Sequence, residues 1–172
     1  NCREFNSLKT DIVNIIEIKK IFNEYKPEIV IHTAAISRPE LCDSLPKELV
    51  NEINVNSTVY LSELCRDHNS KLIFTSTDLV YNGDQGQMLN EESKINPISL
   101  YAETKIESEN KIKDIFDNYI ILRTSLLFGM GMNHSVNNFH IMLNNLKSNK
   151  RSKLFYDQYR TPLSLKNAAE II

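Results

Sequence analysis

The apolar positions of this chain alternate between runs at helical spacing and short β-rich runs. The first run recurs every three to four residues and ends at Pro27, which predicts a helix over 11–26. The next stretch, EIVIHTAA at 28–35, is too short for a helix and rich in β-branched residues, which predicts a buried strand. The inward positions of the expected helix are Ile15, Ile18, Phe22 and Tyr25.

The same alternation continues along the chain, and Gly, Asn and Pro concentrate in one loop over 81–97. We expect strands over 71–77, 119–125 and 153–156, and helices over 46–66, from 99 onward, over 135–147 and over 164–172. Strands that alternate with helical crossovers are typical of a parallel sheet covered by helices on both faces. The pattern therefore predicts an α/β fold with a doubly wound parallel sheet.

Composition and charge exclude several function classes. With 41% hydrophobic residues and a net charge of −2, the chain offers no basic face for nucleic acid, and no apolar run is long enough to cross a membrane. Its three cysteines are odd in number and widely spaced, which suits a reducing cytoplasm better than a disulfide framework. The four histidines lack the paired spacing of metal ligands, so we expect no metal site.

The residues that follow each strand are the candidates for chemistry, because ligands of parallel sheets bind at the carboxyl ends of the strands. The stretches in that position are HTAAISRP from 32, STDLVY from 76 and RTSLLFG from 123. Thr77 ends one expected strand and Tyr101 begins the next helix, so both can face one cleft. Tyr101 and Lys105 share a helix face by their spacing, although such a pair also arises by chance.

Five motifs, HTAA, NVNST, FTSTDLVYNG, YAETK and LRTSLLFG, occur in the order and rough spacing of the extended short-chain dehydrogenases/reductases. From about Asp11 to its last residue the chain resembles this family. It is most similar to the dTDP-4-dehydrorhamnose reductase branch, which carries Ser-Thr-Asp at a strand end, and the 24 positions from Thr77 to Tyr101 fit that branch. The resemblance implies a partial Rossmann-like NAD(P)-binding domain over 1–130 and the beginning of a substrate-binding region, interleaved with it, over 131–172.

The resemblance also implies an NAD(P)H-dependent oxidoreductase that reduces the 4-keto group of a nucleotide sugar, as in dTDP-rhamnose biosynthesis. Tyr101 is then the general acid that protonates the carbonyl oxygen, and Thr77 holds the same oxygen through its hydroxyl. Lys105 supplies the positive charge that a phenol with a pKa of about 10 needs, and it bonds the nicotinamide ribose. Without the motif, an ordinary strand-end hydroxyl is the better explanation of Thr77.

Other positions follow from the same resemblance. The residues implied for binding NADPH or NADH are Asp11, Ile12, Thr33, Ala34, Ala35, Tyr101, Lys105 and Ser125. The residues implied for the substrate are Thr77, Asp78 and Arg160, and the arginine suits a diphosphate. Asn54 is expected to organise the site and Arg123 to be structural. An Asp before a helix, as at position 11, is also an ordinary N-cap.

Two sister reactions and one non-catalytic role remain as alternatives. Sugar-nucleotide 4,6-dehydratases carry Thr-Asp-Glu where this chain has Thr77, Asp78 and Leu79, so elimination is disfavoured. Epimerases often carry a Ser-rich version of the same motif. The alternative from a different class is a regulatory subunit that binds a dinucleotide and a partner enzyme, as in the regulator of methionine adenosyltransferase.

The chain departs from the family in lacking a Gly-x-x-Gly-x-x-Gly turn, since GMG at 129–131 has neither the spacing nor the context. We expect about 60 residues with that turn, the length of a pair of ~30-residue βαβ units, to precede this stretch in a longer enzyme. The choice between NAD and NADP depends on that segment. We further expect a cytoplasmic protein with a nucleotide-sugar substrate and no nucleic-acid or membrane partner, and a homodimer stays open.

Overall fold

The computed structural model describes residues 7–84, 86, 88–129, 138–153, 156 and 160–172. The chain divides into two compact units, Asn1–Leu122 and Arg123–Ile172, and each is described by itself. The boundary expected from the sequence, at 130–131, divides the cofactor-binding region from the substrate-binding region. It stays a prediction. In the described ranges, no helix is both long and apolar enough to cross a membrane.

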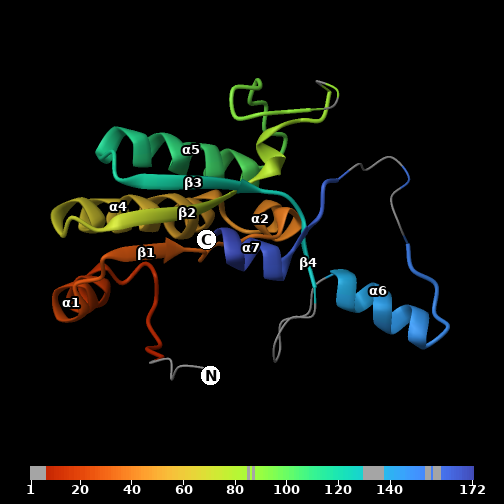
Figure 1. Ribbon diagram of the computed structural model, residues 1–172, viewed down its shortest axis with the longest axis horizontal. Helices are drawn as coiled ribbons and strands as arrows, with labels where there is room; N and C mark the ends of the chain where they lie inside the picture. The colour runs from red at the N-terminus through yellow and green to blue at the C-terminus, as the bar shows by residue number, and fades with distance from the viewer. Residues whose placement is uncertain (1–6, 85, 87, 130–137, 154–155, 157–159) are drawn as a thin grey trace. The chain divides into compact units, whose positions relative to one another are not determined.

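A sheet of β1 (Ile29–His32), β2 (Lys71–Thr77) and β3 (Tyr119–Thr124) forms the centre of the first unit, in the order β1-β2-β3 (Figure 1). β1 and β2 are parallel, with Ile29 opposite Lys71 and His32 opposite Phe74. The strands expected from the β-branched runs at 28–35, 71–77 and 119–125 are therefore confirmed, and their order places β2 in the middle.

Long helices precede each of these strands, as the sequence predicts. They are α1 (Ile15–Tyr25), α4 (Ser57–Asp67) and α5 (Leu100–Ile115). The Asn14 side chain caps the first turn of α1 by accepting from the Glu17 N–H, and Ser99 caps α5 by accepting from the Ala102 N–H. Helix α1 ends at Tyr25, and its C-cap, Lys26, takes a left-handed conformation (φ 43°) directly before Pro27.

The core of the first unit lies between these helices and one face of the sheet. Its buried members are Ile18, Phe22, Leu61, Leu64, Cys65, Leu72, Phe74 and Ile112. Because side chains alternate along a strand, Ile29, Ile31 and Ile120 point to the opposite face, and they are 56%, 51% and 42% exposed. The sequence predicts helices on both faces of the sheet. The described helices of this unit cover one face.

The expected helix over 46–66 is interrupted. Helix α3 (Lys47–Asn51) runs into a π-helical turn, η1 (Glu52–Asn56), before α4 begins, and a short helix α2 (Pro39–Ser44) precedes them. A π turn shifts the register of the backbone hydrogen bonds. The Asn54 carbonyl accepts from the hydroxyls of Thr58 at 2.8 Å and of Ser108 at 2.9 Å.

The second unit contains α6 (Asn138–Lys147), α7 (Leu165–Ile171) and a two-stranded parallel ladder. The ladder pairs β4 (Leu127–Phe128) with β5 (Leu163–Ser164), and the sequence pattern does not predict it because each strand is only two residues long. Both helices were expected from their periodicity. The strand expected at 153–156 falls largely outside the described residues.

Candidate functional site

Tyr101 and Lys105 come together with the carboxyl end of β2, as their spacing predicts. The Ser99 cap fixes the start of α5, so Tyr101 lies in its first turn and Lys105 one turn later. Both side chains are buried, at 9% and 2% exposed. The Lys105 ammonium donates to the Thr75 carbonyl of β2 at 2.8 Å. The helix and the strand therefore hold the amine beside the strand end where the sequence places the chemistry.

Thr77, the last residue of β2, caps a short 3₁₀ turn, η2 (Asp78–Val80). Its oxygen accepts from the Leu79 N–H at 3.2 Å, and its hydroxyl donates to the Asp78 carboxylate at 3.4 Å. A hydroxyl has a single proton, so a carbonyl substrate can be bonded only when Thr77 turns that proton away from Asp78. The long Asp78 bond makes such a turn inexpensive, because hydrogen bonds weaken with distance.

Burial and neighbouring rings set the electrostatics of Lys105. Its Nζ lies 4.5 Å from the centroid of the Phe74 ring and 5.9 Å from that of Tyr101. Burial lowers the pKa of Lys105 to about 8, and the charge of Glu109 works in the opposite direction. At neutral pH the amine is therefore still mostly an ammonium, although it is close to losing its proton.

Burial is also the main influence on the Tyr101 phenol. Burial raises the pKa of Tyr101 to about 12, and the charges of Cys42 and Asp78 add to that rise. The Lys105 ammonium donates to the Thr75 carbonyl, and the lowering of the phenol pKa by its charge stays a prediction. A phenol with this pKa keeps its proton at neutral pH.

Asn54 ties the segment after β1 to helix α5. Its side-chain oxygen accepts from the Ile36 N–H at 2.8 Å, and its amide nitrogen donates to the Ile36 carbonyl at 3.2 Å and to the Thr104 hydroxyl at 3.1 Å. Asn54 is buried, so each of these bonds replaces one that water would make. The π turn that interrupts the helix brings this amide to α5, three residues beyond Tyr101.

His32 is a buried residue of the site region that the sequence does not single out. It is 3% exposed and its Nε2 lies 3.0 Å from the Thr58 hydroxyl. Because Thr58 gives its own proton to the Asn54 carbonyl, it accepts from His32, which fixes the neutral tautomer with hydrogen on Nε2. Burial, and to a smaller extent the positive charge of Lys105, lower the pKa of His32 to about 4.

We expect His32 to make the protein acid-sensitive. Its folded pKa of about 4 lies below the ordinary 6.5, so its contribution to stability is complete above pH 6.5 and is lost as the pH falls toward 4. The loss is about 3 kcal/mol in the free energy of unfolding. Urea unfolding at pH 7 and pH 4 should show a smaller acid loss for His32→Gln than for wild type.

The matched control for this titration is His68→Gln, which removes another imidazole from the same unit, at the carboxyl end of α4. It should retain the acid loss of the wild type. An acid loss in His32→Gln that equals the wild-type loss would contradict the assignment to His32.

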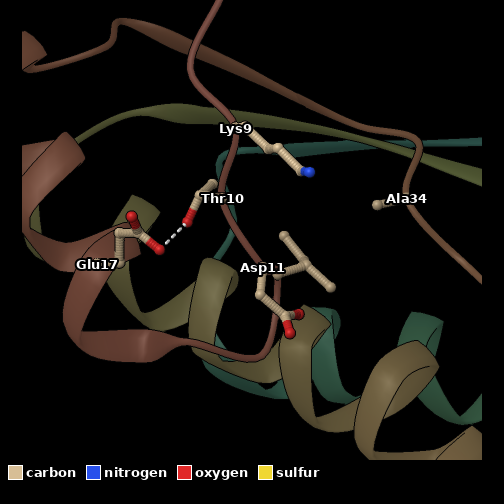
Figure 2. Close-up of a pocket in the computed structure, with 6 residues that line it drawn as sticks. Lys9, Thr10, Asp11, Glu17 and Ala34 are labelled. Atoms are coloured by element: carbon tan, nitrogen blue, oxygen red, sulfur yellow. Dashed lines mark hydrogen bonds between the residues drawn. The ribbon is translucent and has the colours of Figure 1, made fainter.

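Asp11, Ile12 and Ala34, three of the residues implied for the cofactor, line an open hollow of about 580 Å³ with Lys9, Thr10 and Glu17. Figure 2 shows the Lys9 side chain extending toward Ala34 and the Thr10 hydroxyl bonded to Glu17, at 2.6 Å. The Asp11 carboxylate accepts from the Val13 N–H at 3.2 Å. Asn14, rather than Asp11, is the N-cap of α1.

The remaining predicted positions are only partly brought together. Thr33 is exposed and Ala35 half-buried after β1, and neither lines the hollow. Ser125 and Arg160 belong to the second unit, half-buried and exposed respectively. Among the described residues, no group of three or more His, Cys, Asp or Glu side chains is arranged to hold a metal ion.

Curated relatives with different names match this chain. Methionine adenosyltransferase 2 subunit beta of Xenopus tropicalis is 28% identical over 162 residues, which are 94% of this chain and 48% of the relative. The dTDP-4-dehydrorhamnose reductase of Aggregatibacter actinomycetemcomitans is 32% identical over 119 residues, which are 69% of this chain and 40% of the relative. The chain thus spans about half the length of the curated relatives it matches, or less.

Solved structures share the fold. A dTDP-4-dehydrorhamnose reductase from Clostridium acetobutylicum matches with a TM-score of 0.83 and 33% identity, over 94% of this chain and 56% of that chain. The dTDP-4-dehydrorhamnose reductase of Bacillus anthracis, solved in complex with NADP, matches with a TM-score of 0.73 and 28% identity, over 83% of this chain and 49% of that chain. The Rossmann-like α/β class expected from the sequence is confirmed.

The family described as the RmlD substrate binding domain matches residues 2–172, which is nearly the whole chain. This match agrees with the resemblance carried by the five motifs and with the geometry of Tyr101, Lys105 and Thr77. The chain belongs to the RmlD substrate-binding domain family, among the short-chain dehydrogenase/reductase-like proteins.

Proposed function

We propose that this chain forms part of an NAD(P)H-dependent reductase that converts a 4-keto nucleotide sugar, of the dTDP-4-dehydrorhamnose kind, to its alcohol. The observation that carries the proposal is the buried Tyr101–Lys105 pair, held against the carboxyl end of β2 by the bond from Lys105 to the Thr75 carbonyl. Thr77 ends the same strand. In this proposal Tyr101 is the proton donor, Lys105 the cation and Thr77 the second hydroxyl of one site.

The roles of these side chains follow from their chemistry. A bound reduced nicotinamide would supply the hydride that adds to the carbonyl carbon. Tyr101, protonated at neutral pH, gives its proton to the carbonyl oxygen, so that the C=O bond becomes a C–OH. Lys105 stabilises the phenolate that remains, and Thr77 donates to the same oxygen while charge develops there.

The cofactor would extend from this site toward the hollow near the start of α1. The Asp11 carboxylate can accept a hydrogen bond from an exocyclic amine, and Ile12 offers apolar surface to a base. Ala34, with its single methyl group, lets a flat ligand approach the backbone. We place the protein in the cytoplasm, with which the buried free thiols of Cys42 and Cys65 agree.

A second function is favoured by a specific observation. Methionine adenosyltransferase 2 subunit beta matches 94% of this chain, against 69% for the curated reductase. A regulatory subunit would bind a dinucleotide and a partner enzyme without turnover. The complete set of Thr77, Tyr101 and Lys105 favours the reductase, since regulation does not require a proton donor. Leu79, in the place of a glutamate, argues against a dehydratase.

The test is consumption of NADPH or NADH with dTDP-4-dehydrorhamnose. Because the chain spans half of its relatives, it is assayed both alone and joined to those residues of the Clostridium acetobutylicum reductase that lie outside the match. Turnover by the chimera establishes the reductase and shows which cofactor serves. Dinucleotide binding without turnover of this and related keto sugars would contradict the reductase function and favour the function of a regulatory subunit.

A further inference from the structure

Glu109 extends the line of side chains that begins with the proposed catalytic pair. Tyr101, Lys105 and Glu109 follow one another at intervals of four along α5, so they lie on one side of the helix. Glu109 is only 1% exposed. A buried carboxylate loses the hydration that stabilises its charge, so it persists only where partners compensate.

The contacts of Glu109 anchor its carboxylate to the sheet. The Ser76 hydroxyl of β2 donates to Oε1 at 2.6 Å, within the range of a hydroxyl bonded to an ionised carboxylate. Lys113 lies 3.9 Å from Oε2 and is half-exposed, so water weakens its contribution. The carboxylate therefore joins α5 to Ser76 of β2. Ser76 directly follows Thr75, whose carbonyl accepts from Lys105.

The charged and titratable groups around Lys105 come from two elements. From β1, His32 is neutral at pH 7 and adds no positive charge. From α5, Tyr101 is also neutral, and Glu109 supplies the negative charge that favours the ammonium. Lys113 acts on Glu109 from the same helix. Glu109 is thus the acidic group that opposes the effect of burial on Lys105.

We propose that Glu109 is a positioning residue for Lys105, whose buried carboxylate, anchored by the Ser76 hydroxyl, keeps the ammonium charged and beside the end of β2. The catalytic meaning of this arrangement rests on the proposed reductase function. The arrangement itself is a property of the folded protein, so it can be measured without turnover.

The experiment follows the titration of Lys105 by NMR in protein labelled with ¹³C and ¹⁵N lysine, with the Lys105 signal assigned by its loss in Lys105→Arg. Glu109→Gln keeps the shape of the side chain and an acceptor for Ser76 but removes the charge. We expect the Lys105 midpoint to fall by about one pH unit from about 8, a tenfold change in its acid dissociation constant. Glu109→Asp, which restores the charge, should give a midpoint between those of the wild type and Glu109→Gln.

The matched control is Glu107→Gln, which removes one negative charge from the exposed side of α5. A Lys105 midpoint that moves equally in Glu107→Gln and Glu109→Gln would overturn the proposal, as would no movement in Glu109→Gln. If Glu109→Gln does not fold, the proposal is tested by following the pH dependence of the NMR spectrum of wild-type protein with ¹³C-labelled glutamate carboxyls. Its Glu109 signal should inflect at the midpoint of Lys105, and a signal without that inflection contradicts the coupling. A protein that passes these tests but reduces no keto sugar would contradict only the reductase function.

Discussion

Tyr101→Phe is expected to lower the rate of keto-sugar reduction by about 10²- to 10⁴-fold, the usual contribution of a general acid. Burial raises the pKa of the Tyr101 phenol to about 12, so at neutral pH the native side chain carries a proton to donate. The variant has no such proton. The change removes one oxygen and little volume. The dissociation constant of NADPH should therefore stay within about threefold of the wild-type value. Steady-state kinetics and cofactor titration of the chimera measure the two quantities.

Tyr119→Phe is the matched control for this result. It makes the same chemical change at the first residue of β3, where the side chain packs against the core of the first unit. Its turnover should remain close to the wild-type rate, since Tyr119 lies at the amino end of its strand. Equal losses of turnover and cofactor affinity in Tyr101→Phe would show that the phenol is structural. Equal losses of turnover in both variants would show a general effect of losing a phenol.

The strands and the long helices were predictable because their signals are local. The β-branched run that forms β2 and the periodic apolar residues of α1 determine their own backbone conformation before any tertiary contact. The interruption at Glu52–Asn56 was not predictable in the same way. The residue that marks this interruption is Asn54, whose side-chain amide forms hydrogen bonds with Ile36 and Thr104, both far away in the sequence. A long-range contact of this kind leaves no periodicity to read.

The shared helix face of Tyr101 and Lys105 was predictable from the sequence, but their electrostatics were not. Spacing alone placed Tyr101 and Lys105 on one face of α5, and the rule for parallel sheets placed Thr77 beside them. The bond from Lys105 to the Thr75 carbonyl, and the burial that raises the pKa of Tyr101, depend on packing that a sequence does not state. His32 escaped notice for the same reason, since a buried histidine has no characteristic spacing.

Phe74→Ala is expected to lower the free energy of unfolding by about 3–5 kcal/mol, the usual loss when a buried Phe is truncated. Phe74 is fully buried in the middle strand, with its ring centroid 5.6 Å from that of His32 and 4.5 Å from the Lys105 ammonium. The truncation therefore leaves a cavity in the core directly beneath the proposed catalytic amine. Urea unfolding measures this loss, which is a large share of the ~5–15 kcal/mol typical of a domain.

Two companion variants separate the causes of that loss. Phe116→Ala removes a ring at the edge of the same core, where Phe116 is only half-buried, and should cost less than Phe74→Ala. Phe74→Leu fills most of the cavity but removes the aromatic face that favours the Lys105 ammonium, so it should recover stability while the pKa of Lys105 falls below about 8. Equal losses in the two alanine variants would mean that the core relaxes around position 74. In that case Phe74 would not be a rigid part of the core beside Lys105.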